Sequence, residues 1–125
     1  MPRYPLGKSR KLLLREDYAA LRDAPHVLRG KLCIVFFKRT NRASSRLGMT
    51  IKGRTTSVDR SLIKRIVREW FRQSFPQSFL LTAEGISMDL NVFLNLPFRN
   101  IQRAQIKVSL AADLRRIFEK ILLTP

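Results

Sequence analysis

The sequence has 125 residues, of which 45% are apolar and 27% are charged, and this predicts one globular domain over residues 1–125 and excludes a multi-domain enzyme. It contains 25 lysine and arginine residues against 9 aspartate and glutamate residues, and the formal net charge of +16 indicates a polyanionic partner, either nucleic acid or an anionic membrane. No apolar run reaches the roughly 18 residues that a membrane-spanning helix needs, so we expect no membrane partner.

The basic residues are concentrated in the first two-thirds of the chain. Residues 1–82 hold 19 basic and 5 acidic residues, whereas residues 83–125 hold 6 and 4. Arginine outnumbers lysine by 17 to 8, and the planar guanidinium group pairs with phosphate through two parallel hydrogen bonds and stacks on bases. The charge therefore favours a nucleic-acid-binding surface built from residues 1–82.

The first half of the chain predicts a short helix followed by two main strands. The helix covers about residues 15–23 and ends before Pro25, because proline disfavours helical geometry in the residue before it. Residues 31–39 are rich in β-branched and aromatic side chains, and residues 46–52 alternate apolar and polar ones. A further short strand over residues 27–29 is weakly indicated.

The second half predicts a long helix, a strand and a final helix. The helical period continues through residues 57–74 and stops before Pro76. Residues 90–96 alternate as in a strand with one buried face, and Pro97 ends them. A last helix is expected over about residues 105–122. Helices and strands interleave around a mixed or antiparallel sheet, so the predicted fold class is α+β.

The cysteine and the histidine are interpreted as structural. Cys33 lies in an apolar run with no second cysteine to pair with, which indicates a buried thiol and a reducing compartment, the cytoplasm. His26 follows Pro25 and is expected in a surface loop.

A metal-independent nuclease needs paired acid-base groups, commonly histidines, and a two-metal nuclease needs clustered carboxylates. Neither pattern is present, and this inventory agrees with a protein that is not itself catalytic.

Basic residues recur every four positions along the long predicted helix. Arg60, Lys64, Arg68 and Arg72 share one side at about 100° per residue, with Arg65 close beside them. An ordinary solvated helix face would also be amphipathic, but such faces generally mix charges of both signs. Here one acidic residue stands among five basic ones. These five residues, called the basic stripe below, are the predicted contact to phosphates, whereas the aromatic residues of this helix are expected in the core.

Two successive motifs resemble a known family. Residues 46–51, Arg-Leu-Gly-Met-Thr-Ile, precede a short loop and a helical segment, residues 58–69, that contains Lys64-Arg65 and Arg68-Glu69. This resembles the bacterial ribonuclease P protein subunit, whose pattern is R-[LI]-G and then a helix with A-V-x-R-N-R and K-R-x-x-R-E. The segments that are similar to the start of the family pattern are Leu6-Gly7-Lys8, Lys11-Leu12 and Asp17-Tyr18.

The resemblance implies a fold and a function. Family members fold as one α-β-β-β-α-β-α domain with a left-handed β-α-β crossover. The protein assists a catalytic RNA that uses bound Mg²⁺ to remove the 5′ leader of precursor tRNA, so it belongs to an endoribonuclease without carrying the chemistry. The implied partners are the catalytic RNA subunit and precursor tRNA, in the cytoplasm, with neither a membrane nor DNA as partner.

A cleft between the sheet and the first helix holds the single-stranded leader in the family. The positions that the resemblance assigns to this cleft are Lys11, Tyr18, Thr50 and Lys52. Single-stranded nucleic acid is held by stacking of its bases on aromatic rings and by cations along its backbone. These residue types therefore agree with the implied role.

A strand aromatic is also expected in the cleft. In the strand over residues 31–39, alternation puts Phe37 on the same face as Lys31 and Arg39, and Phe36 on the other face with apolar residues. Because cations favour the exposed face, we predict that Phe37 lies in the cleft and Phe36 in the core.

The chain departs from the family at two helix positions. Ser61 stands where the family has asparagine, and Leu62 stands where it has the second arginine of R-N-R. Serine keeps one donor and acceptor but loses the reach of the amide. Leu62 falls on the apolar arc of the helix, so we expect it to pack in the core.

Charge alone leaves two alternatives. A general or ribosome-associated RNA-binding protein would use the same basic helix but would have no preference for a 5′ leader. A DNA-binding regulator would use residues 57–74 as its recognition helix, but a strand and a loop precede this helix where a helix-turn-helix protein has another helix.

Overall fold

The computed structural model describes residues 15–22, 26–40, 45–74, 87–98 and 101–123. The elements in chain order are α1 (Arg15–Arg22), β1 (His26–Arg29), β2 (Cys33–Thr40), β3 (Arg46–Gly53), α2 (Ser57–Ser74), β4 (Ser87–Leu96), the 3₁₀ turn η2 (Arg103–Gln105) and α4 (Ile106–Leu123). This order confirms the α+β class and the predicted sequence of helices and strands. No helix within the described ranges is long and apolar enough to cross a membrane.

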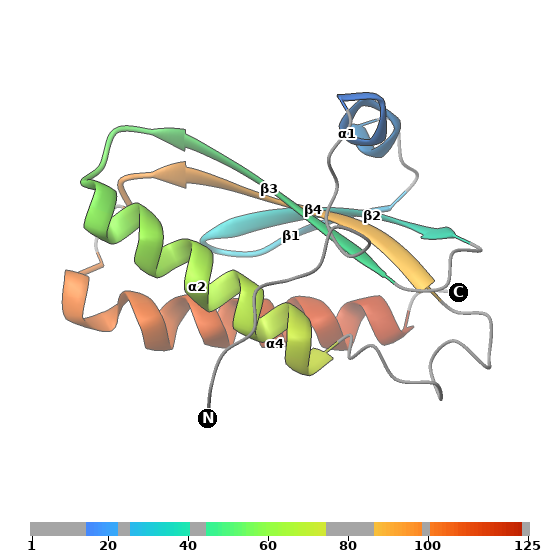
Figure 1. The fold of residues 1–125 in the computed structure, drawn as a ribbon. Helices are drawn as coiled ribbons and strands as arrows, with labels where there is room; N and C mark the ends of the chain where they lie inside the picture. The colour runs from blue at the N-terminus through green and yellow to red at the C-terminus, as the bar shows by residue number, and fades with distance from the viewer. Residues whose placement is uncertain (1–14, 23–25, 41–44, 75–86, 99–100, 124–125) are drawn as a thin grey trace.

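The four strands form one mixed sheet in the order β1-β2-β4-β3. β2 is antiparallel to both β1 and β4, whereas the edge strand β3 is parallel to β4. Parallel neighbours need a crossover connection, and α2 supplies it between β3 and β4. In Figure 1, β3 lies in front of β4, both strands run toward the left, and α2 returns beneath them. The crossover is therefore left-handed, as the resemblance implies and against the usual rule.

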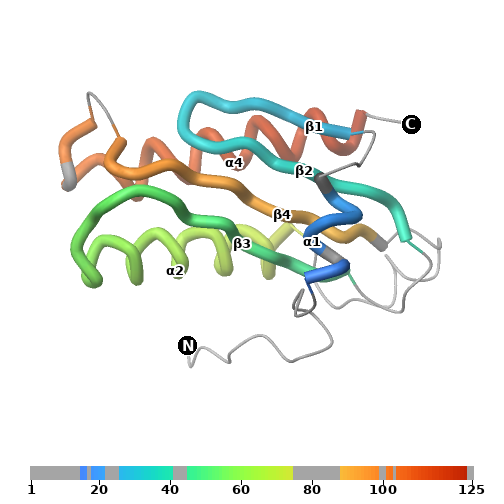
Figure 2. Tube along the Cα trace, turned by 90° about the horizontal axis from the view of Figure 1, so that it is seen from above, coloured from blue at the N-terminus to red at the C-terminus, as the bar shows by residue number. Residues whose placement is uncertain are grey.

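The helices cover the two faces of the sheet unequally. α2 and α4 pack side by side against one face, whereas α1 lies alone over the other (Figure 1). In the view from above, α1 is the described helix that crosses this second face, over β2 and β4 (Figure 2). The core lies on the two-helix side, where strand residues such as Val35 and Val92 meet helix residues such as Phe71 and Leu114.

Two boundaries differ from the prediction because strand pairing extends or shortens the elements. β4 begins at Ser87 rather than at Leu90, since its first residues pair with both β2 and β3. The strand expected from Lys31 begins at Cys33, because Lys31 and Leu32 lie in the turn between β1 and β2.

The prediction that His26 lies in a surface loop is wrong. His26 is the first residue of β1, and its partially buried ring stacks on that of Phe37 with the centroids 4.9 Å apart. The short strand that was weakly indicated therefore exists, because pairing with β2 supplies the hydrogen bonds that its own sequence signals only faintly.

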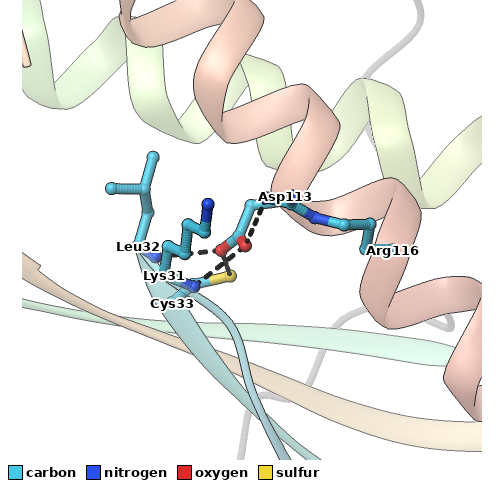
Figure 3. Close-up of polar contacts among 5 residues, drawn as sticks. All are labelled: Lys31, Leu32, Cys33, Asp113 and Arg116. Atoms are coloured by element: carbon cyan, nitrogen blue, oxygen red, sulfur yellow. Dashed lines mark hydrogen bonds and ion pairs between the residues drawn. The ribbon is translucent and has the colours of Figure 1, made fainter.

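A buried carboxylate holds the β1–β2 turn against α4 (Figure 3). Asp113, 2% exposed, accepts hydrogen bonds of 2.9 Å from the backbone N–H groups of both Lys31 and Leu32. The Cys33 thiol lies 3.4 Å from the same carboxylate, and Arg116 forms an ion pair with it at 3.3 Å. A Cβ at Gly30 would collide with this carboxylate, so the turn needs glycine there.

Burial and hydrogen bonding set the protonation of this cluster. Burial opposes ionisation of Asp113, but hydrogen bonds from Leu32, Lys31 and Cys33 outweigh it and lower the pKa of the carboxyl group. Burial, together with the Asp113 charge, raises the pKa of the Cys33 thiol far above its ordinary value. Cys33 is thus a buried protonated thiol, which confirms its predicted burial.

Candidate nucleic-acid interface

The helix that carries the basic stripe begins with a threonine cap. The Thr56 hydroxyl accepts a hydrogen bond of 3.1 Å from the backbone N–H of Asp59, and the Thr56 carbonyl accepts one of 3.0 Å from the N–H of Arg60. Asp59 lies in the first turn, where a negative charge interacts favourably with the helix dipole. The cap and the dipole together explain why the helix starts at Ser57.

The basic stripe starts beside β3, where Arg60 contacts the end of that strand, and its five residues lie outside the part of α2 that borders α4. Ile63, Ile66, Val67, Trp70 and Phe71 are buried, which confirms the core prediction for the aromatic residues of this helix. The opposite flank borders a hollow of about 180 Å³ against α4. The residues of this hollow include Glu69, Gln73, Lys107, Arg115 and Phe118.

Within the stripe, exposure and contacts differ between residues. Lys64, Arg68 and Arg72 are half-buried, and Arg65 is exposed. Among the acidic side chains of the described ranges, none forms an ion pair with Lys64, Arg65 or Arg68. These three side chains thus carry charge that no described carboxylate neutralises.

Arg60 has a structural contact that the sequence did not reveal. Its guanidinium group donates hydrogen bonds of 3.2 Å to the carbonyl oxygen of Ile51 and of 3.1 Å to that of Gly53. Gly53 ends β3 with a φ of 99°, and a Cβ there would collide with the Leu96 backbone. Arg60 thus joins the start of α2 to the end of β3, and part of its hydrogen-bonding capacity is already used.

The arginine of the Arg-Leu-Gly motif is also engaged within the protein. Arg46 donates from Nε and Nη2 to the two carboxylate oxygens of Asp89, at 2.9 and 2.6 Å. Asp89 is 2% exposed and lies directly opposite Arg46 in the parallel register. This bidentate ion pair joins the beginnings of β3 and β4. It explains why the motif begins with an arginine.

A cleft of about 670 Å³ opens between α1 and the face of the sheet opposite α2 and α4. Tyr18 of α1 and both Thr50 and Lys52 of β3 line it, so the structure brings these three predicted residues together. Lys11 lies outside the described residues. The remaining lining residues are Arg15, Phe36, Met49, Asn91 and Phe93.

The prediction that Phe37 lies in the cleft and Phe36 in the core is wrong. Phe37 is fully buried on the α2–α4 side, whereas Phe36 is half-buried and lines the cleft. β2 is an inner strand with both faces partly covered, so its apolar residues do not alternate with polar ones. Lys31 lies in the turn before β2, and Arg39 lies near the end of the strand. Neither residue therefore indicates toward which face of the sheet the side chains in the middle of β2 point.

Besides Phe36, sequence reasoning missed four cleft residues, namely Arg15, Met49, Asn91 and Phe93. Arg15 opens α1 and reaches the cleft together with Tyr18. Asn91 and Phe93 belong to the face of β4 opposite its buried leucines, and the Lys52 ammonium lies 5.9 Å from the centroid of the Phe93 ring. A signal for Phe93 was present, since it is an aromatic residue on the otherwise polar side of an alternating strand.

The two departures from the family pattern lie on different sides of α2. Ser61 is exposed, next to the basic stripe. Leu62 is half-buried and packs against the core, as its place on the apolar arc predicts. No group of three or more His, Cys, Asp or Glu side chains within the described ranges is arranged to hold a metal ion.

Comparison with known proteins gives one consistent result. The sequence pattern of the family described as Ribonuclease P matches residues 6–121. The ribonuclease P protein component of Desulforapulum autotrophicum is 26% identical over 125 residues, covering 98% of this chain and 97% of that protein.

Two solved structures share the fold. A Staphylococcus aureus RNase P protein, a mutant with defective mRNA degradation activity, superimposes with a TM-score of 0.66 at 20% identity, covering 88% of this chain and 89% of that one. The RNase P protein from Thermotoga maritima has a TM-score of 0.58 at 24% identity, covering 85% of this chain and 96% of that one. Because the family pattern spans nearly the whole sequence and the fold agrees, this chain belongs to the family of ribonuclease P proteins.

Proposed function

We propose that this protein is the protein subunit of a ribonuclease P ribonucleoprotein, which removes the 5′ leader of precursor tRNA. In this proposal the basic stripe binds the catalytic RNA subunit, and the cleft binds the single-stranded leader. Family membership supports the assignment to an endoribonuclease complex that processes tRNA.

The observation that carries the proposal is the composition of the cleft. Tyr18, Phe36 and Phe93 provide aromatic rings from three different elements, and Arg15 and Lys52 provide cations beside them. Aromatic faces stack bases of any identity, while cations follow the phosphate backbone, and together these are the needs of a single strand. A duplex, whose bases are already stacked, would not use such rings.

The basic stripe suits a folded RNA instead. Lys64, Arg65 and Arg68 lie along one flank of a rigid 18-residue helix and offer charge without an aromatic platform. Each phosphate neutralised by such a cation releases condensed counterions, which favours binding most strongly at low salt. We therefore assign to this flank the sequence-independent contacts to the catalytic RNA.

Both surfaces meet at the edge strand. Lys52 of the cleft lies between Ile51 and Gly53, the two residues whose carbonyl oxygens bind Arg60 of the stripe. A strand of RNA in the cleft and a folded RNA on α2 would thus be neighbours. This arrangement supports simultaneous binding of leader and catalytic RNA, which would raise affinity for precursor over mature tRNA.

The chemistry is assigned to the RNA subunit with its bound Mg²⁺. The described residues include one histidine, His26, which stacks on Phe37, and Asp89 and Asp113 are each engaged in an internal ion pair. The roles left for this protein are to bind, orient and discriminate. We place the complex in the cytoplasm, with precursor tRNA and the catalytic RNA as partners and with neither DNA nor a membrane.

The test is reconstitution with the ribonuclease P RNA of the same organism. We expect the protein to permit cleavage of precursor tRNA at Mg²⁺ concentrations where the RNA alone is slow, and to raise affinity for precursor tRNA over mature tRNA. Lys52→Ala, which removes a cation of the cleft, should reduce the affinity for precursor tRNA. Lys107→Ala, which removes an exposed cation of α4, is the matched control and should leave that affinity unchanged. Unchanged cleavage and equal affinity for both tRNA forms would refute the proposal and favour a general RNA-binding protein.

A further inference from the structure

A polar pair lies on the floor of the cleft, between aromatic side chains. Asn91 of β4 is 6% exposed, and its amide nitrogen lies 3.1 Å from the hydroxyl oxygen of Thr50, to which it donates a hydrogen bond. The same hydroxyl lies 3.3 Å from the Asn91 amide oxygen. In the strand register Asn91 is opposite Phe36, and Thr50 is opposite Phe93. All four side chains line the cleft.

This pair leaves hydrogen-bonding capacity in the amide. An asparagine side chain has two N–H donors and an oxygen that can accept twice, and one hydroxyl group satisfies at most one of each. Over the ranges that the structure describes, Thr50 is the side chain that hydrogen-bonds the Asn91 amide. A buried amide with part of its capacity unused is unfavourable unless water or a ligand in the cleft completes it.

The rings and cations of the cleft offer contacts that are common to all nucleotides. Phe36 and Phe93 offer ring faces, and every base has a face that can stack on them. Arg15 and Lys52 are cations suited to phosphates, which are the same in every nucleotide. Sequence is read through hydrogen bonds to base edges, and Asn91 and Thr50 are the neutral polar residues that the sheet itself places opposite the two phenylalanines, whereas Tyr18 belongs to α1.

We infer that Asn91, held by Thr50, reads the edge of one leader base that stacks against Phe36 or Phe93. The leader affinity of this protein therefore depends on the identity of the nucleotide at one position. Asn91 is the specificity-determining residue, and Thr50 orients its amide. The inference rests on the proposed function, because it presumes that a single-stranded leader occupies the cleft.

The test measures binding of the reconstituted holoenzyme to precursor tRNAs that carry each of the four nucleotides at each leader position. For the unmodified protein we expect a preference of about tenfold at one position, the size of effect that a good hydrogen-bonded base contact produces. Asn91→Leu, similar in volume but without hydrogen-bonding groups, should abolish this preference. Affinity for the least favoured base should change little, since stacking and phosphate contacts remain.

The matched control is Asn95→Leu, the same replacement two residues further along β4 at an exposed position that does not line the cleft. It should leave the preference intact. If Asn91→Leu does not fold, as judged by circular dichroism, Thr50→Val provides the second variant, because loss of the hydroxyl releases the amide and should weaken the preference at the same position.

The outcomes separate this inference from the proposed function. Discrimination of precursor from mature tRNA without any base preference would overturn the role of Asn91 and leave the proposed function standing. A preference that survives in the folded Asn91 and Thr50 variants would also overturn it. Equal binding of precursor and mature tRNA would overturn both.

Discussion

The guanidinium group of Arg60 donates a hydrogen bond of 3.1 Å to the carbonyl oxygen of Gly53, and so ties the first turns of α2 to the last residue of β3. Its second bond, to the carbonyl of Ile51, lies on the other side of Lys52. One side chain thereby sets the position of the basic helix relative to a cation of the cleft. We interpret Arg60 as a positioning residue as well as a member of the basic stripe.

Arg60→Ala should uncouple the two surfaces. Loss of two partly exposed hydrogen bonds from a charged donor is expected to lower the free energy of unfolding by about 1 kcal/mol. The same variant should reduce the preference for precursor over mature tRNA, because Lys52 and α2 are no longer held together. Urea unfolding and competition binding measure the two effects, and an unchanged unfolding curve would contradict the positioning role.

Arg68→Ala should remove one phosphate contact from the basic stripe. The slope of log affinity for the catalytic RNA against log salt concentration is expected to fall by about one. Arg115→Ala, an exposed arginine of α4 on the far flank from the stripe, is the control and should leave the slope unchanged. An equal loss of slope in both variants would mean that binding is diffuse and that the flank of α2 has no special role.

Two adjacent phenylalanines should behave in opposite ways. Phe37→Ala removes a fully buried ring and is expected to cost about 3–5 kcal/mol of stability. Phe36→Ala should remain folded and weaken leader binding by about 1–3 kcal/mol, the range for loss of a stacked base. Thermal unfolding and leader-dependent affinity distinguish the variants, and the reverse result would restore the facing that the sequence suggested.

Asp113 should make stability depend on pH in the acidic range. Its pKa is lowered in the folded state, so its contribution is fully present above the unfolded-state pKa and is lost as the pH falls through the folded-state value. The difference in unfolding free energy between the unmodified protein and Asp113→Asn should therefore shrink as the pH drops below the ordinary value of 3.8. Urea unfolding at several pH values measures it, and a constant difference would show that the charge of Asp113 is not the stabilising feature.

Some features of the site follow from local sequence alone. The long helix over residues 57–74 has a regular apolar arc, a threonine before it and Pro76 beyond it, so its existence and its basic stripe depend on nothing distant. Tyr18, Thr50 and Lys52 could likewise be assigned to a common cleft through the family resemblance. Periodicity and motif order are local properties, and a sequence displays them directly.

The sequence by itself determined the class of the fold, the charge of the partner and the helix that offers cations. Tertiary structure alone decided which face of β2 turns toward α2 and α4. As a result Phe36 lines the cleft and Phe37 lies in the core. It also brought Asn91 beside Thr50, 41 positions apart, and Arg46 against Asp89. The physical reason is that an inner strand is apolar on both faces, so the choice of face and the partners across the sheet depend on how distant elements pack.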